Sequence, residues 1–331
     1  MTDATDRGPS PAMEKLAILV VYLVRDEDDL HLLRLHLARV RRHTLVPYTI
    51  YAAAHRATPA GAAILEAEPN VVLCDLTPTE LRGSREHGYY LDALAPRAIA
   101  AGATHLVTLD IDSFPIDDRW IDVLEQSAST DSGVAAILRV ENGDVALPHP
   151  SCMLLSREFF ERYAPSFSPD SDMTPDFRRF LHTTGQAGDT GIRLAYTLWS
   201  EHLHWGKLLR TNVENPHYLI AGIYADVVFH LGAGARSTLF RADLEHSRAH
   251  RLTRPIERYR PRTASTARLK ARVLTFLRSK SERRIIERNG SVAANVRTWL
   301  LRDSDALIAY LRGGDSGTER ADVGVFTRRQ R

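Results

Sequence analysis

The chain has 331 residues, of which 44% are hydrophobic and 25% are charged, with a net charge of +2, and this composition excludes a wholly disordered or fibrous protein. Its two cysteines, Cys74 and Cys152, form no spaced pair, which excludes a disulfide scaffold and indicates a reducing, cytoplasmic compartment. The longest early apolar run, residues 16–24, has about half of the roughly 20 residues that a transmembrane helix needs.

Charge is distributed unevenly along the chain. Residues 241–331 hold 22 Lys and Arg and 10 Asp and Glu, a net charge of +12. Residues 1–240 hold 21 Lys and Arg and 31 Asp and Glu, a net charge of −10. Residues 1–15 mix Asp, Pro, Gly and Ser and lack the basic start and apolar centre of a signal peptide, so we expect a disordered lead. We expect a main domain over residues 16–245 and a basic helical extension over residues 246–331 with a disordered end.

Apolar runs alternate with helical patterns over the first 125 residues. The predicted strands cover residues 16–24, 48–54, 71–75 and 105–109. The predicted helices between them cover residues 28–43, 59–68 and 84–102. This alternation predicts an α/β fold with a largely parallel sheet, whose ligands bind beyond the carboxyl ends of the strands.

The pattern changes after residue 125. Two further strands are expected within residues 133–140 and 149–163, the second running into a short helix; residues 164–188 are expected to form a long loop containing a helical turn or two. A helix over residues 190–205 and a strand ending at His230 follow. The extension carries two amphipathic helical patterns, one starting at Leu269 and the other at Val292.

Two aspartates, Asp110 and Asp112, follow the fourth predicted strand in the segment LVTLDIDSFP. Side chains alternate along an extended segment, so both would point the same way, and two converging carboxylates repel unless a cation lies between them. Mg²⁺ or Mn²⁺ satisfies both, because these cations prefer oxygen ligands and often complete their coordination with phosphates. The alternative is that both acids cap the next turn, which the SFP sequence is expected to form.

Other classes of protein are also considered for this pair. A phosphatase of the haloacid dehalogenase type would use Asp110 as nucleophile and Asp112 as general acid, but it places the pair on its first strand and requires a later Lys. A sugar-nucleotide pyrophosphorylase would open with a Gly-rich loop, which the segment VVYLVRDEDD lacks. A non-catalytic protein that binds nucleic acid or membranes through its basic end is a third alternative, although aromatic residues are sparse there.

The segment HLVTLDIDSFP resembles the D-x-D element of glycosyltransferases with the GT-A fold. In that family the pair follows the fourth strand of the nucleotide-binding half and holds a divalent metal against the diphosphate of a nucleotide sugar. The resemblance covers residues 16 to about 240. It implies a nucleotide-binding half over residues 16–125, an acceptor-binding half over residues 126–245, Mn²⁺ or Mg²⁺ as cofactor and a nucleoside-diphosphate sugar, in particular a UDP-sugar, as donor.

Two further segments match the layout of the family. In GSREHGYYLDALAPRAIAAG, the resemblance implies contacts to the nucleotide sugar from Ser84, Arg85 and His87, since a helix start capped by Ser84 would favour phosphate. In VVFHLGAGAR, it implies that His230 is the third metal ligand and that Arg236 contacts a phosphate oxygen. Structural roles for each of these side chains are the alternative.

A third segment, GQAGDTGIRLAYTLW, contains the candidate catalytic base. Inverting GT-A enzymes use an Asp or Glu to deprotonate the acceptor hydroxyl, and Asp189 is the candidate here. Its alternative role is to cap the helix expected from Thr190. Asp26 and Asp75, at the ends of the first and third strands, are further candidate nucleotide contacts. The second strand lacks the acidic pair common in inverting enzymes, so the stereochemical outcome and the identity of the base stay open.

The extension has three possible roles from its sequence: packing onto the enzyme, peripheral contact with the inner face of the membrane through residues 264–312, and nucleic-acid binding. The last is not favoured, because the extension carries no nucleic-acid recognition motif. Arg outnumbers Lys by 39 to 4 in the chain, which indicates a GC-rich bacterial genome.

Overall fold

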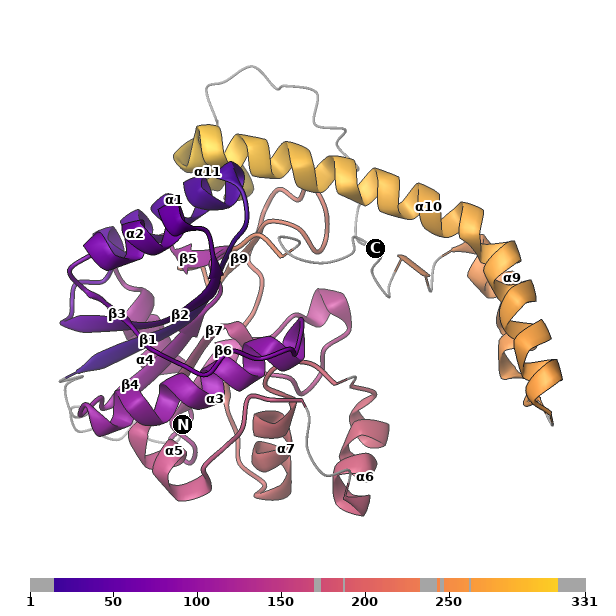
Figure 1. The fold of residues 1–331 in the computed structure, drawn as a ribbon, viewed down its shortest axis with the longest axis horizontal. Coiled ribbons are helices and arrows are strands. Elements are labelled where there is room, and N and C mark those ends of the chain that lie inside the picture. Colours follow the sequence, from indigo (N-terminus) through magenta and orange to yellow (C-terminus); the bar gives the residue numbers. More distant parts are fainter. Residues whose placement is uncertain are drawn as a thin grey trace, which may run out of the picture. The chain divides into compact units, whose positions relative to one another are not determined.

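The computed structural model describes residues 15–169, 174–186, 188–232, 243–244, 247–261 and 263–314 (Figure 1). Contacts divide the chain into two units: the first comprises residues 1–138, 145–210 and 224–229, and the second comprises residues 139–144, 211–223 and 230–331. The boundaries predicted near residues 125 and 245 stay predictions. The predicted disordered end and nearly all of the predicted lead lie outside the described residues.

The first unit is built around a seven-stranded mixed sheet with the strand order β3-β2-β1-β4-β7-β6-β8. Its strands are β1 Leu16–Val24, β2 Tyr48–Ala57, β3 Val71–Leu73, β4 His105–Leu109, β6 Val134–Ile137, β7 His149–Ser156 and β8 Gly206–Leu208. Strands β3, β2, β1 and β4 pair in parallel, β7 runs antiparallel to both of its neighbours, and β6 pairs in parallel with β8. The predicted α/β class and mostly parallel sheet are therefore confirmed.

Helices cover both faces of this sheet (Figure 1). The helices of the first unit are α1 Glu27–His43, α2 Pro59–Ala67, α3 Ser84–Ala100, α4 Trp120–Ser127, α5 Arg157–Tyr163, α6 Pro175–Thr184 and α7 Ile192–Ser200. Buried residues of α1, α2 and α4 pack with one face of the sheet, and those of α3, α5 and α7 pack with the other. The segment predicted as a loop with a helical turn or two thus contains the ten-residue helix α6.

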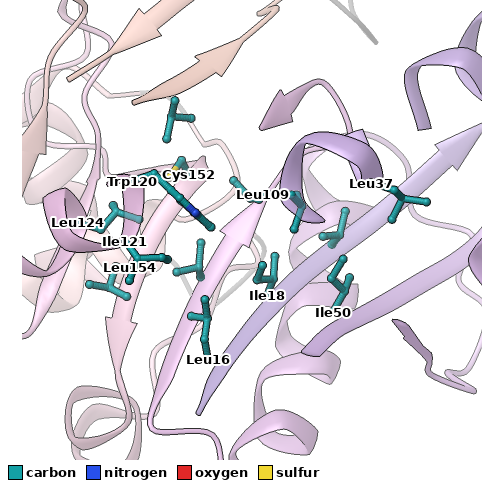
Figure 2. Close-up of a cluster of buried hydrophobic side chains, with 14 of the residues drawn as sticks. Leu16, Ile18, Leu37, Ile50, Leu109, Trp120, Ile121, Leu124, Cys152 and Leu154 are labelled. Atoms are coloured by element: carbon teal, nitrogen blue, oxygen red, sulfur yellow. The ribbon is translucent and has the colours of Figure 1, made fainter. Parts of the chain in front are cut away.

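Alternating side chains of the central strands separate two buried cores, which explains why β1 is apolar throughout. Leu16 and Ile18 of β1 point into the core covered by α1 and α4, whereas Ala17 and Leu19 point into the core covered by α3. Figure 2 shows the first core, in which Trp120 of α4 lies among aliphatic side chains from the sheet. A sheet buried on both faces offers ligands only its edges and strand ends, so a ligand site is expected at the strand ends.

A second sheet of three short strands has the order β5-β10-β9, with β5 Ser113–Pro115, β10 Val228–His230 and β9 Gly222–Tyr224. The SFP sequence is therefore a strand, and the prediction that it forms a turn is wrong. It extends because Ile116 N–H donates to Val227 O at 2.8 Å and the Ser113 hydroxyl donates to Phe229 O at 3.1 Å. The chain leaves β4 in one sheet and enters β5 in the other within a few residues.

The second unit is mainly helical, with the 3₁₀ turn η1 Val140–Asn142, α9 Arg248–Arg258, α10 Ala264–Arg302 and α11 Ser304–Leu311. The first predicted amphipathic pattern and the start of the second belong to one 39-residue helix, α10, which begins with a capping box at Thr263. The end of the second pattern, Leu307 and Leu311, lies in α11. No proline interrupts α10, and the single Gly290 costs only about 1 kcal/mol relative to Ala. Within the described residues, no helix combines the length and apolar content needed to cross a bilayer.

Candidate metal and nucleotide-sugar site

The D-x-D segment lies directly beyond the carboxyl end of β4, which has parallel β1 beside it. Its backbone forms a turn closed by the Ser113 N–H, which donates to Asp110 O at 2.9 Å. The prediction that both aspartates lie along an extended segment is therefore wrong, although their carboxylates converge. They converge because this turn, which joins β4 to β5, brings one carboxylate oxygen of each aspartate within 4.8 Å of the other.

His230 joins the two aspartates through the pairing of β5 with β10. It is the last residue of β10 and is bonded to Phe229, whose carbonyl oxygen accepts the Ser113 hydroxyl. One ligand atom from each of Asp110, Asp112 and His230 lies within 4.8 Å of the other two. The D-x-D pair and the predicted late histidine are thus brought together by the small sheet.

The three residues suit a divalent cation. Two carboxylates at this separation repel each other unless a positive charge lies between them, and Asp112 and His230 are almost completely buried, where that repulsion is little screened. Carboxylate oxygens and one imidazole nitrogen form a ligand set that Mn²⁺ accepts and that leaves positions for phosphate oxygens and water. The arrangement therefore fits Mn²⁺ or Mg²⁺.

A buried histidine that the sequence analysis missed lies beneath this turn. The ring of His36 on α1 is fully buried against the backbone of Ile111 and Ser113, on either side of Asp112. Burial lowers the pKa of His36 to about 4, so the ring is neutral at physiological pH. The sequence could not predict this contact, because His36 lies on the apolar face of α1 and meets the turn only through the packing of α1 on β5.

The first turn of α3 contacts the D-x-D turn. His87 Nε2 lies 3.3 Å from Asp110 Oδ1, and both side chains are largely buried. The helix begins at Ser84, but its N-cap is Gly83, so the prediction of Ser84 as the N-cap is wrong. Gly83 has φ 63° and ψ −135°, a conformation that residues with a Cβ rarely adopt. Arg85 is exposed in this same turn.

Ser84 is bound instead to the candidate base. The Ser84 hydroxyl donates to Asp189 Oδ1 at 2.6 Å, and the same oxygen accepts the N–H of Thr190 at 2.8 Å. The hydroxyl of Thr190 in turn donates to Ser84 O at 3.1 Å. The helix α7 begins at Ile192 with Gly191 as its N-cap, so Asp189 does not cap it as the alternative supposed. The first turn of α3 thus contacts two carboxylates, that of Asp189 through Ser84 and that of Asp110 through His87.

Gly88 fixes the position of this turn, and its substitution is expected to destabilise the protein. An alanine Cβ there would lie 2.5 Å from the Cα of Ser168 and 2.7 Å from Phe167 O, both of them backbone atoms held in place by Asp92. We expect Gly88→Ala to lower the free energy of unfolding by about 1–3 kcal/mol, because overpacking outweighs the better helix propensity of Ala. Thermal unfolding measures the effect.

The matched control for this prediction is Gly188→Ala. Its Cβ would meet only the Pro169 Cβ, at 3.9 Å, so we expect a melting temperature close to that of the unchanged protein. If Gly88→Ala melted at the same temperature as Gly188→Ala, the close packing of α3 on residues 167–168 would be wrong.

The remaining predicted site residues are not part of the group formed by Asp110, Asp112 and His230. Asp26 follows β1 and caps α1, its carboxylate accepting the Asp29 N–H at 2.9 Å. Asp75 is exposed after β3. Arg236 lies outside the described residues. Nearby, the Arg56 guanidinium bonds to Glu86 Oε2 at 2.8 Å at the end of β2, a pair that the sequence analysis did not single out.

No family model and no curated protein matches the chain. Among solved structures, it is similar to the mannosyltransferase PcManGT from Pyrobaculum calidifontis, in complex with GDP-Man and Mn²⁺, at 12% identity over 89% of this chain and 84% of that one, with a TM-score of 0.41. The galactosyltransferase LgtC, in complex with donor and acceptor sugar analogs, is 12% identical over 59% of this chain and 73% of that one, with a TM-score of 0.36.

A third similar structure is TarS 1–349 from S. aureus, at 10% identity over 46% of this chain and 50% of that one, with a TM-score of 0.32. At identities and TM-scores this low, the activity has to be argued from the residues of the site itself.

Proposed function

We propose that this chain is a metal-dependent glycosyltransferase that transfers a sugar from a nucleoside-diphosphate sugar to an acceptor hydroxyl. The observation that carries the proposal is the convergence of Asp110, Asp112 and His230 at the carboxyl end of the central sheet. A triad that holds a divalent cation beside a helix start is suited to an anionic diphosphate, because the helix N–H groups and the cation both favour negative charge.

The residues divide into three roles. Asp110, Asp112 and His230 would hold Mn²⁺ or Mg²⁺, which when bound neutralises the negative charge of a departing diphosphate. The first turn of α3 binds the nucleotide sugar through its N–H groups and Arg85, with Ser84 and His87 fixing the neighbouring carboxylates. Asp189 takes the proton from the acceptor hydroxyl, or, if the enzyme retains the anomeric configuration, a substrate oxygen takes it.

The finer assignments follow the resemblance drawn from the sequence. We propose a UDP-sugar as donor, with Asp26 and Asp75 as contacts to its nucleotide and Arg236 as a contact to a phosphate oxygen. The ends of β1 and β3, where Asp26 and Asp75 lie, are at the edge of the sheet on which parallel strands bind their ligands.

Thermal unfolding with a panel of nucleoside diphosphates and nucleotide sugars, with and without Mn²⁺, tests the proposed function. We expect one nucleoside diphosphate to raise the melting temperature only when Mn²⁺ is present. A ligand at about 100 times its Kd stabilises the folded state by about 2.7 kcal/mol, which such a measurement detects. If no nucleotide or nucleotide sugar stabilised the protein in a metal-dependent way, the proposed function would be wrong.

A further inference from the structure

The first half of α10 exposes a stripe of large apolar side chains. Leu269, Val273, Phe276 and Leu277 are 62%, 36%, 80% and 45% exposed. Their spacing of four, seven and eight residues places them on one face of the helix. An exposed apolar stripe of this size on a helix needs an occupant, because isolated surface leucines are common but a contiguous row is not.

The opposite face of this half of α10 is occupied by α9, which lies beside it (Figure 1). The Arg278 guanidinium donates to Thr253 Oγ1 at 2.7 Å and bonds to Glu257 Oε2 at 3.0 Å. His250 Nε2 lies 3.0 Å from Glu282 Oε1. The two helices therefore form a hairpin, and the packing of α9 leaves the apolar stripe uncovered.

Cations border the stripe on the same side of α10. They are Arg272, Lys280, Arg283 and Arg284. Among the residues that the structure describes, none of them forms an ion pair with a carboxylate. Residues 247–287 carry 13 Lys and Arg and 3 Asp and Glu, a net charge of +10. The occupant of this face is therefore expected to be anionic as well as apolar.

We propose that the hairpin of α9 and α10 docks on an anionic phospholipid bilayer through the face that runs from Leu269 to Arg284. Phe276 and the leucines would enter the boundary between head groups and acyl chains while the arginines and Lys280 contact lipid phosphates. A second copy of the chain fits less well, because pairing two such faces sets their cations against each other. This inference goes beyond the proposed function, since it concerns where the chain binds and not the reaction.

Co-sedimentation of the full chain with vesicles tests the proposal. We expect binding to vesicles of phosphatidylcholine mixed with phosphatidylglycerol, little binding to phosphatidylcholine alone, and release at high salt. Phe276→Ser should weaken partitioning by about tenfold or more. The double substitution Arg283→Gln and Arg284→Gln should weaken it by roughly 25-fold, since each cation near the surface contributes about fivefold.

The matched controls are Leu45→Ser, which removes another exposed leucine, and Arg157→Gln with Arg162→Gln, which removes two cations from α5. Both should bind the mixed vesicles as the unchanged chain does. Equal binding by the Phe276 and Leu45 variants, or equal binding to both kinds of vesicle, would overturn the proposal. Dimerisation through this face would also overturn the proposal. Sedimentation velocity without vesicles would then show a dimer for the unchanged chain and a monomer for Phe276→Ser. Metal-dependent stabilisation by nucleotides is unaffected by any of these results, so the two proposals fail separately.

Discussion

The substitution Asp112→Asn is expected to lower metal-dependent turnover of a nucleotide sugar by about 10³-fold or more while the protein stays folded. Asn has the shape of Asp but lacks the charge that a divalent cation requires, and a loss of about 4 kcal/mol of transition-state stabilisation corresponds to about 10³-fold in rate. The fold should tolerate the change, because it removes one of two carboxylates that repel each other near His230. Steady-state rates with Mn²⁺ and the donor found in the nucleotide panel measure the effect.

The matched control is Asp122→Asn, which removes the charge of an exposed acid in the first turn of α4. We expect its rate to stay within about twofold of the unchanged enzyme, because a surface acid at a helix start contributes a few tenths of a kcal/mol to stability alone. Near-normal turnover by Asp112→Asn, with the same dependence on Mn²⁺, would contradict the assignment of Asp112 as a metal ligand.

Asp189→Asn is expected to have the second largest effect, lowering kcat by about 10² to 10⁴-fold with a smaller change in the KM for the donor. This range is the usual contribution of a positioned general base. The amide still accepts the hydrogen bond from Ser84 but no longer takes a proton, so the loss should fall on kcat. Initial rates across a range of pH measure the effect, and the acidic limb of the profile, where a general base becomes protonated and inactive, should change with it.

Ser84→Ala separates a catalytic from a positioning role for Asp189. It removes the 2.6 Å hydrogen bond to Asp189 but leaves the carboxylate in place, so we expect a loss of about fivefold, the net value of one hydrogen bond. If Ser84→Ala and Asp189→Asn reduced kcat equally, Asp189 would serve only to hold α3, and a substrate oxygen would be the better candidate for the proton acceptor.

Most of the seven-stranded sheet could be predicted from the sequence, because its strands other than β8 are encoded locally. The apolar run of β1 and the D-x-D after β4 have their predicted bounds and position, since period and length identify strands that are buried on both faces. The small sheet could not be predicted in this way. β10 ends at His230 as predicted, but β5 and β9 have three residues each, and only their pairing with β10 makes them strands.

The sequence predicted the three residues of the metal site, but it did not predict the turn that brings the carboxylates together or the contact of Ser84 with Asp189. Asp110, Asp112 and His230 were identified, but a turn and not an extended segment brings the carboxylates together. The contact of Ser84 with Asp189 carries no sequence signal, because both residues look like helix caps when read locally and neither is one. Residues far apart in the chain meet here through tertiary packing, which overrides local preference.

The most direct test of the central claim is a titration of the protein with Mn²⁺, followed by the electron paramagnetic resonance signal of the free ion, in the presence of the stabilising nucleoside diphosphate. We expect one Mn²⁺ bound per chain by the unchanged protein and by Asp122→Asn, and at least about tenfold weaker binding by Asp112→Asn. Equal binding of Mn²⁺ by Asp112→Asn and the unchanged protein would contradict the claim that Asp112 holds the metal.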